Sequence, residues 1–182
     1  MIAQRELWRF IGLLFLIASV WIHYEIKVVR FGNEVHQLGA TKVGSAAANF
    51  SARDLADQEV TLASFQGRKV VVLDFWATWC GPCRMTMPAL QKLHTEFKGR
   101  PVEILSINQG ETAEAVQQFL QKKGYTFHAV MDPNSAIGTQ YGVHGIPTLL
   151  VIDKQGVIQS IEVGPTWTIK ELRELLERLL QT

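Results

Sequence analysis

A nearly unbroken apolar run at residues 70–76, VVVLDFW, limits the fold of this chain more than any other feature of the sequence. Such branched aliphatic runs are typical of strands buried on both faces, because a strand with one wet face alternates apolar and polar residues. The run from Val70 to Phe75 therefore predicts a buried strand. A helix is expected directly after it, from Cys80 to Lys98, because apolar residues recur on one of its faces.

Apolar periodicity and turn residues predict the remaining elements. Strands that alternate with helices and end in a hairpin indicate an α/β fold, a mixed sheet with helices on both faces. The predicted elements are a hairpin at 50–55 and 59–62, a strand at 102–107, a helix at 113–123 ended by Gly124, a strand at 126–130, a helix at 134–141, a hairpin at 148–152 and 157–163, and a last helix opened by the capping box Thr168-x-x-Glu171.

The first 30 residues differ in kind from the rest. Residues 10–22, FIGLLFLIASVWI, are thirteen uncharged residues, which span about 20 Å as a helix against the roughly 30 Å hydrocarbon core of a bilayer. A cleaved signal peptide and an interfacial helix therefore compete with a membrane anchor. We favour an uncleaved anchor at residues 1–30, because residues 21–24, WIHY, make a poor cleavage site and the flanking Trp and Tyr rings suit the membrane interfaces.

Residues 31–48 carry small and polar side chains without periodicity, and we expect them to be a tether. The folded domain is then predicted at residues 49–182. The chain has 18 basic and 17 acidic residues and a formal net charge of +1. It therefore lacks the excess positive charge that binds a phosphate backbone, which argues against nucleic-acid binding. Its two cysteines, Cys80 and Cys83, are too close in sequence to join distant segments, so their role is chemical or incidental.

The two cysteines lie where the first buried strand feeds its helix, in the segment WATWCGPCRMTMPAL. The helix dipole and free amide N–H groups at that terminus favour the Cys80 thiolate and lower the Cys80 pKa below its ordinary value. Cys80 is therefore the predicted nucleophile. The C-x-x-C spacing places Cys83 close enough to attack a mixed disulfide on Cys80, so Cys83 is the predicted resolving thiol.

A carboxylate, Asp74, interrupts the apolar strand six residues before Cys80. Burying a carboxylate is costly unless the group is paired or protonated. We predict that Asp74 exchanges a proton with Cys83. Without the cysteines, an ion-paired structural residue would be the better interpretation.

Together these features resemble the thioredoxin superfamily: the motif WCGPC, the acid six residues upstream, Pro88 five residues after Cys83, and the later segment GIPTLL. More narrowly, the sequence is similar to the membrane-anchored thiol-disulfide oxidoreductases of the TlpA, ResA and CcmG type. That likeness rests on the apolar N-terminal segment, the hairpin FSARDLADQEVTLASFQGR, the 64 positions from Cys83 to Pro147, and the segment LLVIDKQGVI. It implies a thioredoxin-like mixed sheet with an N-terminal hairpin and a helix-strand insertion, preceded by one transmembrane helix.

The resemblance also implies roles for individual residues. Pro147 should form a cis peptide bond with Ile146 and face the cysteines, and the Ile146 backbone should pair with an extended substrate segment. Trp79, next to the nucleophile, is expected at the rim of the site. The catalytic set is thus Cys80, Cys83 and Asp74, and the substrate-binding set is Trp79, Gly81, Pro82, Ile146, Pro147 and Thr148.

Three departures from the family pattern bear on specificity. Many members of the narrower group have Asn at the position of Asp74. Thioredoxins tend to have a Lys on the neighbouring strand near the acid, and aligning VEILSINQG on their pattern puts Ile104 there, which predicts a raised Asp74 pKa. The cytochrome-maturation members have a Glu after the cis-proline and ResA-like proteins a Glu between the cysteines, where this chain has Thr148 and Gly81-Pro82. These departures leave a role in cytochrome c maturation open.

The resemblance implies an extracytoplasmic thiol-disulfide oxidoreductase at the cytoplasmic membrane, which reduces protein disulfides through Cys80 and Cys83. It implies a membrane electron donor of the DsbD or CcdA type, and substrates such as apocytochrome c or copper-centre assembly factors. Beyond the Cys80–Cys83 disulfide it implies no cofactor, and we expect a monomer. The alternatives are a copper or zinc carrier that uses the cysteine pair, and a binding module without catalysis. Redox chemistry is favoured, because zinc needs further ligands and His94, His128 and His144 show no ligand-like spacing.

Overall fold

The computed structural model describes Ser19 and residues 41–182. The predicted anchor or signal segment at residues 1–30 lies outside the described residues apart from Ser19, and so does most of the predicted tether. Within the described part of the chain, no helix is both long and apolar enough to cross a membrane.

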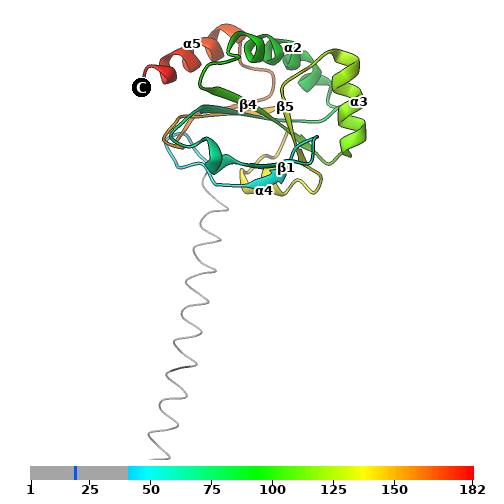
Figure 1. Cartoon of the computed structure of the whole chain (residues 1–182), viewed down its shortest axis with the longest axis horizontal. Coiled ribbons are helices and arrows are strands. Elements are labelled where there is room, and N and C mark those ends of the chain that lie inside the picture. Colours follow the sequence, from blue (N-terminus) through cyan, green and yellow to red (C-terminus); the bar gives the residue numbers. More distant parts are fainter. Residues whose placement is uncertain (1–18, 20–40) are drawn as a thin grey trace, which may run out of the picture. The chain divides into compact units, whose positions relative to one another are not determined.

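A five-stranded mixed sheet forms the centre of the domain (Figure 1). The strand order is β5-β4-β3-β6-β7, in which β3, β4 and β5 are parallel and β6 is antiparallel to both β3 and β7. This arrangement confirms the mixed sheet predicted from the sequence. The strands are β3 (Val70–Trp76), β4 (Val102–Gln109), β5 (His128–Asp132), β6 (Thr148–Ile152) and β7 (Ile158–Val163).

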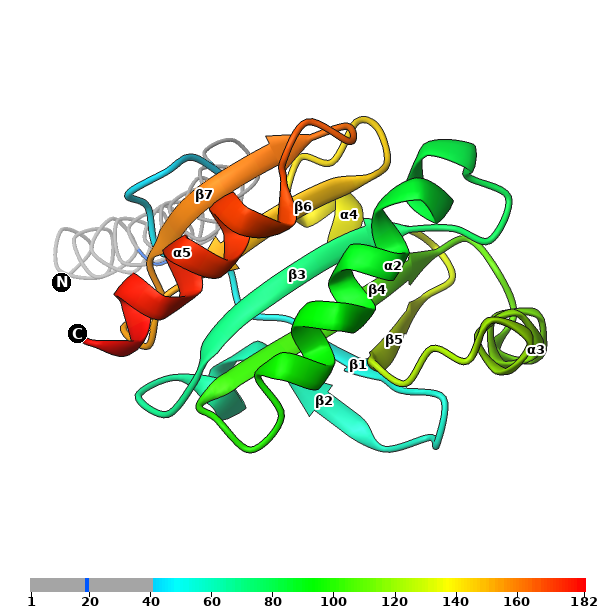
Figure 2. The ribbon, with the colours of Figure 1, turned by 90° about the horizontal axis from the view of Figure 1, so that it is seen from above.

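Helices cover both faces of the sheet, as predicted. Helices α2 and α5 lie over one face, with α3 beyond them at the β5 edge (Figure 1, Figure 2). The other face is covered by the short helix α4, the hairpin β1–β2 and the 3-10 helix η1. Between β4 and β6, α3 and β5 form the expected helix-strand unit. These elements are β1 (Ser51–Arg53), β2 (Glu59–Thr61), η1 (Leu62–Phe65), α2 (Gly81–Glu96), α3 (Ala113–Lys123), α4 (Ala136–Gln140) and α5 (Ile169–Leu180).

The central strand β3 is buried on both faces, which explains its continuous apolar sequence. Its odd-numbered side chains pack with the hairpin and with Tyr141 at the end of α4, whereas Val70 and Val72 pack with residues of α2 and α5. Because side chains along a strand alternate between faces, Asp74 lies on the α2 face, between Val72 and Trp76.

Two elements begin two residues later than the sequence predicts, each where a side chain binds backbone groups. Strand β5 begins two residues late because the backbone N–H of Thr126 donates to Gln91 Oε1 of α2 at 2.8 Å instead of joining the sheet. Helix α4 begins after residue 134 because the Asp132 carboxylate accepts two backbone N–H groups from its first turn, at 3.1 and 2.9 Å. Such contacts leave no trace in apolar periodicity.

The folded domain begins before residue 49, the boundary that composition suggested. Three backbone hydrogen bonds of 2.8–2.9 Å join residues 44–47 to the start of β7 and the turn before it. The Tyr141 hydroxyl donates to the carbonyl oxygen of Ala48. Residues 44–48, which we expected in the tether, therefore belong to the domain. These residues are held by backbone hydrogen bonds, which do not require apolar side chains at regular spacing. The sequence pattern therefore did not show that they belong to the domain.

Candidate active site

The loop after β3 delivers Cys80 to the N-terminus of α2. Cys80 is the N-cap residue of the helix, Cys83 lies in its first turn, and the two form a disulfide bond with their Cα atoms 5.3 Å apart. The backbone N–H of Cys83 donates to Cys80 Sγ at 3.1 Å. This hydrogen bond and the positive end of the helix dipole favour negative charge on Cys80 Sγ once the disulfide is reduced. The geometry therefore supports Cys80 as the nucleophile.

Exposed side chains flank the buried cysteines along the sequence. Trp79 is 69% exposed, as expected for a rim residue, and Met85 on the first turns of α2 is 73% exposed. Between the cysteines, Pro82 is exposed and Gly81 is half-buried. Trp79, directly before Cys80, therefore offers an apolar contact to a substrate that reaches the nucleophile.

The loop before β6 faces the cysteines. Its Ile146–Pro147 peptide bond is cis, as the resemblance implied, and the carbonyl oxygen of Ile146 lies 3.7 Å from Cys80 Sγ. Ile146 is half-buried and Pro147 is buried. Thr148 was predicted to bind substrate, but its side chain is buried and its hydroxyl donates to the carbonyl oxygen of Gly145 at 2.6 Å. The Thr148 side chain thus stabilises the loop from inside.

Asp74 is 1% exposed, and burial raises its pKa to about 7. The residue beside it on β4 differs from the one that sequence alignment suggested. Asp74 pairs in register with Ser106, whereas Ile104 lies opposite Val72, two positions along the strand. The expectation that Ile104 occupies the lysine position of thioredoxins was therefore wrong, although the neighbour is still uncharged.

Sequence analysis missed one residue that holds the site together, Glu111 in the turn after β4. Its carboxylate accepts hydrogen bonds from the backbone N–H of Thr78 at 2.6 Å, from the Thr78 hydroxyl, and from the side-chain amide of Asn108 at 2.8 Å. Because Thr78 lies two residues before Cys80, Glu111 fixes the loop that carries the nucleophile. The contact joins positions 33 apart in sequence, so no local pattern could reveal it.

A metal site is not found among the described residues: they contain no group of three or more His, Cys, Asp or Glu side chains that could hold a metal ion.

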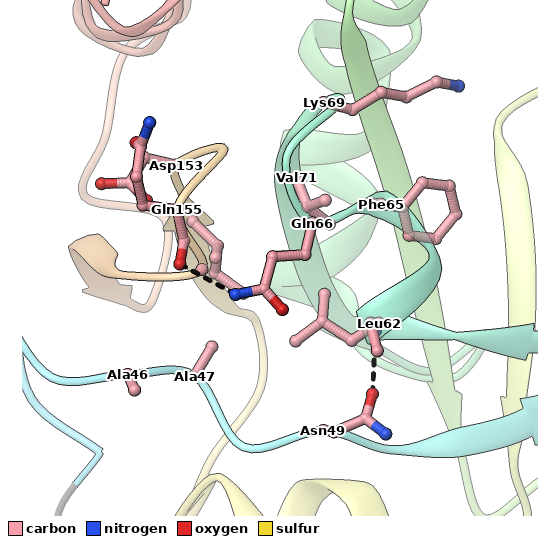
Figure 3. Close-up of a pocket in the computed structure, with 13 residues that line it drawn as sticks. Ala46, Ala47, Asn49, Leu62, Phe65, Gln66, Lys69, Val71, Asp153 and Gln155 are labelled. Atoms are coloured by element: carbon pink, nitrogen blue, oxygen red, sulfur yellow. Dashed lines mark hydrogen bonds between the residues drawn. The ribbon is translucent and has the colours of Figure 1, made fainter.

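A pocket of about 100 Å³ lies away from the cysteines, between residues 46–49, η1 and the β6–β7 turn (Figure 3). In it Gln66 donates to the carbonyl oxygen of Gln155 at 3.2 Å, and Asn49 accepts the backbone N–H of Ala63 at 2.8 Å. None of the predicted site residues lines this pocket.

Similar sequences extend over most of the chain. Residues 43–161 match the AhpC/TSA family. The thiol-disulfide oxidoreductase ResA of Geobacillus thermodenitrificans is 36% identical over 176 residues, which cover 97% of each chain. The thioredoxin-like protein YneN of Bacillus subtilis is 38% identical over 136 residues, which cover 74% of this chain and 78% of YneN.

Solved structures show the same architecture. A thioredoxin-family thiol:disulfide interchange protein of Chlorobium tepidum superimposes with a TM-score of 0.67 at 25% identity, covering 78% of this chain and 99% of that one. A secreted disulfide oxidoreductase of Mycobacterium tuberculosis, homologous to E. coli DsbE, gives 0.63 at 26% identity, covering 71% and 95%. The chain therefore belongs to the AhpC/TSA family of thioredoxin-like proteins and is a thiol-disulfide oxidoreductase of the ResA and DsbE type.

Proposed function

We propose that this chain reduces disulfide bonds in protein substrates, with Cys80 as attacking thiolate, Cys83 as resolving thiol and Asp74 as acceptor of the Cys83 proton. The observation that carries the proposal is the position of Cys80 Sγ, which accepts the Cys83 N–H at the start of α2 and lies beside the Ile146 carbonyl. Gly-Pro between the cysteines resembles the reducing thioredoxins, which favours this direction. The disulfide carries the two electrons, so the reaction needs no bound cofactor.

The chemistry starts from the dithiol form with Cys80 as the thiolate. Its sulfur attacks one sulfur of the substrate disulfide, and the other substrate sulfur leaves as a thiolate. Cys83 then gives its proton to Asp74 and attacks Cys80 Sγ, which expels the first substrate sulfur and closes the Cys80–Cys83 disulfide. The substrate gains two electrons and the chain loses two. Solvent and Asp74 supply the two protons that the substrate thiolates take up.

The surface around the disulfide suits an extended protein segment with apolar residues. Trp79, Met85 and Val163 are among the most exposed large apolar side chains of the described chain. Val163 ends β7 and pairs in register with Thr148, so it lies beside the cis-proline loop. Apolar residues that flank a substrate cysteine can bury against these side chains while backbone groups at Ile146 add a strand-like pairing.

The proposed setting is the outer side of the cytoplasmic membrane. The uncharged run at residues 10–22 supports a membrane attachment, and the family resemblance supports an extracytoplasmic domain that a DsbD-type or CcdA-type protein reduces again. Thiols in such a compartment need a dedicated electron supply, because the surroundings are oxidising. Apocytochrome c and copper-centre assembly factors are the proposed substrates.

Trapping of the mixed disulfide tests the roles of the two cysteines. In the Cys83→Ser variant, Cys80 can attack but nothing resolves the product, so purification without reductant should recover substrates linked to Cys80. Cys80→Ser is the matched control, because it keeps one thiol but removes the nucleophile. Equal trapping by both variants would contradict the assignment.

Insulin reduction tests catalysis independently of the native substrate. The wild-type dithiol should reduce insulin with an added donor, and each single-serine variant should lose multiple turnover. A wild-type protein that forms its disulfide but does not reduce insulin or any trapped substrate would instead favour a binding module.

A further inference from the structure

Four fully buried polar atoms on neighbouring strands have no hydrogen-bond partner among the described residues. They are Asp74 Oδ2 and Trp76 Nε1 on β3, and Ser106 Oγ and Asn108 Oδ1 on β4. Each of these residues is at most 1% exposed. Because a buried polar group without a partner is destabilising, four such atoms in one place require an explanation.

The strand register places these atoms in two complementary pairs. Asp74 lies opposite Ser106, and Trp76 lies opposite Asn108. Register partners in a sheet direct their side chains to the same face, so each pair lies side by side on the face covered by α2. An indole N–H can only donate and an amide oxygen can only accept, and in the same way a serine hydroxyl can donate to a carboxylate. Each pair thus places one donor residue opposite one acceptor residue, without a direct hydrogen bond between them.

Within the described part of the chain, Ser106 is the polar neighbour that the sheet brings to Asp74. The register partner on β6 is Leu149. Of the buried residues of α2, the hydroxyl of Thr86 already donates to the carbonyl oxygen of Cys83 at 3.0 Å. The other buried side chains on α2 and α5 are uncharged: Cys83, Met87, Leu90, Leu93, Leu172 and Leu176.

We propose that Ser106 is a positioning residue whose hydroxyl is linked to the Asp74 carboxylate by hydrogen bonds through one buried water. A hydroxyl rotates about a single bond, so it can orient a bridging water whose own hydrogen points to the carboxylate. Donation to the ionised form stabilises that form, so Ser106 sets the pH at which this buried acid ionises. The consequence for thiol exchange rests on the proposed function of Asp74.

The test compares Ser106→Thr with Ser106→Val in the oxidised full chain. These two side chains have nearly the same shape and differ in one hydroxyl, so changes in packing are shared. The Asp74 pKa is followed by the carbon-13 signal of its carboxyl group, which requires no thiol activity. We expect Ser106→Val to raise this pKa by about one unit and Ser106→Thr to leave it near the wild-type value.

Ser160→Ala is the control, because its hydroxyl lies on β7 and donates to Glu162 at 2.8 Å. This variant should not move the Asp74 pKa. The same Asp74 pKa in the Thr and Val variants would overturn the proposal. If either variant fails to fold, wild type and Ser106→Ala are compared instead, because they also differ in the presence of the hydroxyl at position 106.

The pH profile of insulin reduction separates this inference from the proposed function. In the wild-type background, Ser106→Val should shift the pH profile of the rate toward higher pH. In the Asp74→Asn background, the same substitution should leave the profile unchanged. An Asp74 pKa that moves without the profile supports the role of Ser106 and contradicts proton transfer through Asp74. A pKa that stays while Asp74→Asn alters the profile overturns the Ser106 inference and leaves the proposed function standing.

Discussion

Asp74 makes the folded domain less stable as the pH rises. Burial raises its pKa from the ordinary 3.8 to about 7, so between these values the native state keeps a proton that the unfolded chain releases. In this window the native state binds more protons, and the free energy of unfolding therefore falls as the pH rises. A shift of about three units corresponds to about 4 kcal/mol lost across the window, and the loss is complete above about pH 7.

Asp74→Asn should remove this dependence, because asparagine is neutral at every pH. The variant should gain stability relative to wild type by about 3 kcal/mol between pH 5 and pH 8. Guanidinium unfolding of the two oxidised proteins at both pH values measures this change. Asp57→Asn, at an exposed turn position, is the control and should show no such trend. A constant difference between Asp74→Asn and wild type would mean that the Asp74 pKa is not raised.

At the scale of elements, a charged cluster attaches the N-terminal hairpin to the sheet. In the turn between β1 and β2, Asp54 accepts the backbone N–H of Gln58 at 2.8 Å and approaches His128 Nε2 of β5 at 3.1 Å. On β4, Glu103 lies 3.3 Å from His128 Nδ1 and 2.5 Å from Lys69 Nζ. The Glu103 hydrogen bond is the main cause that raises the His128 pKa, and Asp54 adds to it against the opposing effect of burial.

The raised pKa of His128 predicts a hairpin that loosens at alkaline pH. Below the ordinary value of 6.5 the cluster contributes its full stability, and this contribution is lost as the pH rises through the raised value in the folded state. Hydrogen-exchange protection factors of the hairpin amides should therefore fall as the pH rises above 6.5. His128→Gln should begin with lower protection and lack this fall, whereas His144→Gln, in an exposed loop, should behave like wild type. A wild-type hairpin with constant protection would contradict the prediction.

At the scale of the whole molecule, the segment just before the first strand is part of the stability of the domain. Residues 44–47 make three backbone hydrogen bonds to β7 and the turn before it, and Tyr141 binds the carbonyl oxygen of Ala48. A chain that begins at residue 49 should therefore unfold more easily than one that begins at residue 41, by about 2–4 kcal/mol. Guanidinium unfolding of the two truncated chains measures the difference. Equal stability would mean that the segment adds nothing to the fold.

Local features account for most of what could be predicted. Apolar periodicity located the strands and helices, the left-handed Gly124 ends α3, and the Thr168–Glu171 capping box opens α5 as expected. The C-x-x-C motif at a strand-to-helix junction located the disulfide, because the chemistry there depends on neighbours in sequence. Glu111 could not be found in this way, since its partners belong to a distant loop.

The sequence by itself determined that Asp74 is buried on a central strand that leads, six residues later, into the redox cysteine pair, because both facts follow from local pattern. Only the tertiary structure decided which residue lies next to Asp74. Ile104 and Ser106 are two positions apart on β4 and therefore point to the same face. A shift of the strands by two residues preserves every apolar side chain on its face, so the apolar pattern cannot distinguish the two registers. The packing of the complete sheet selects Ser106, and with it the polar environment of the acid.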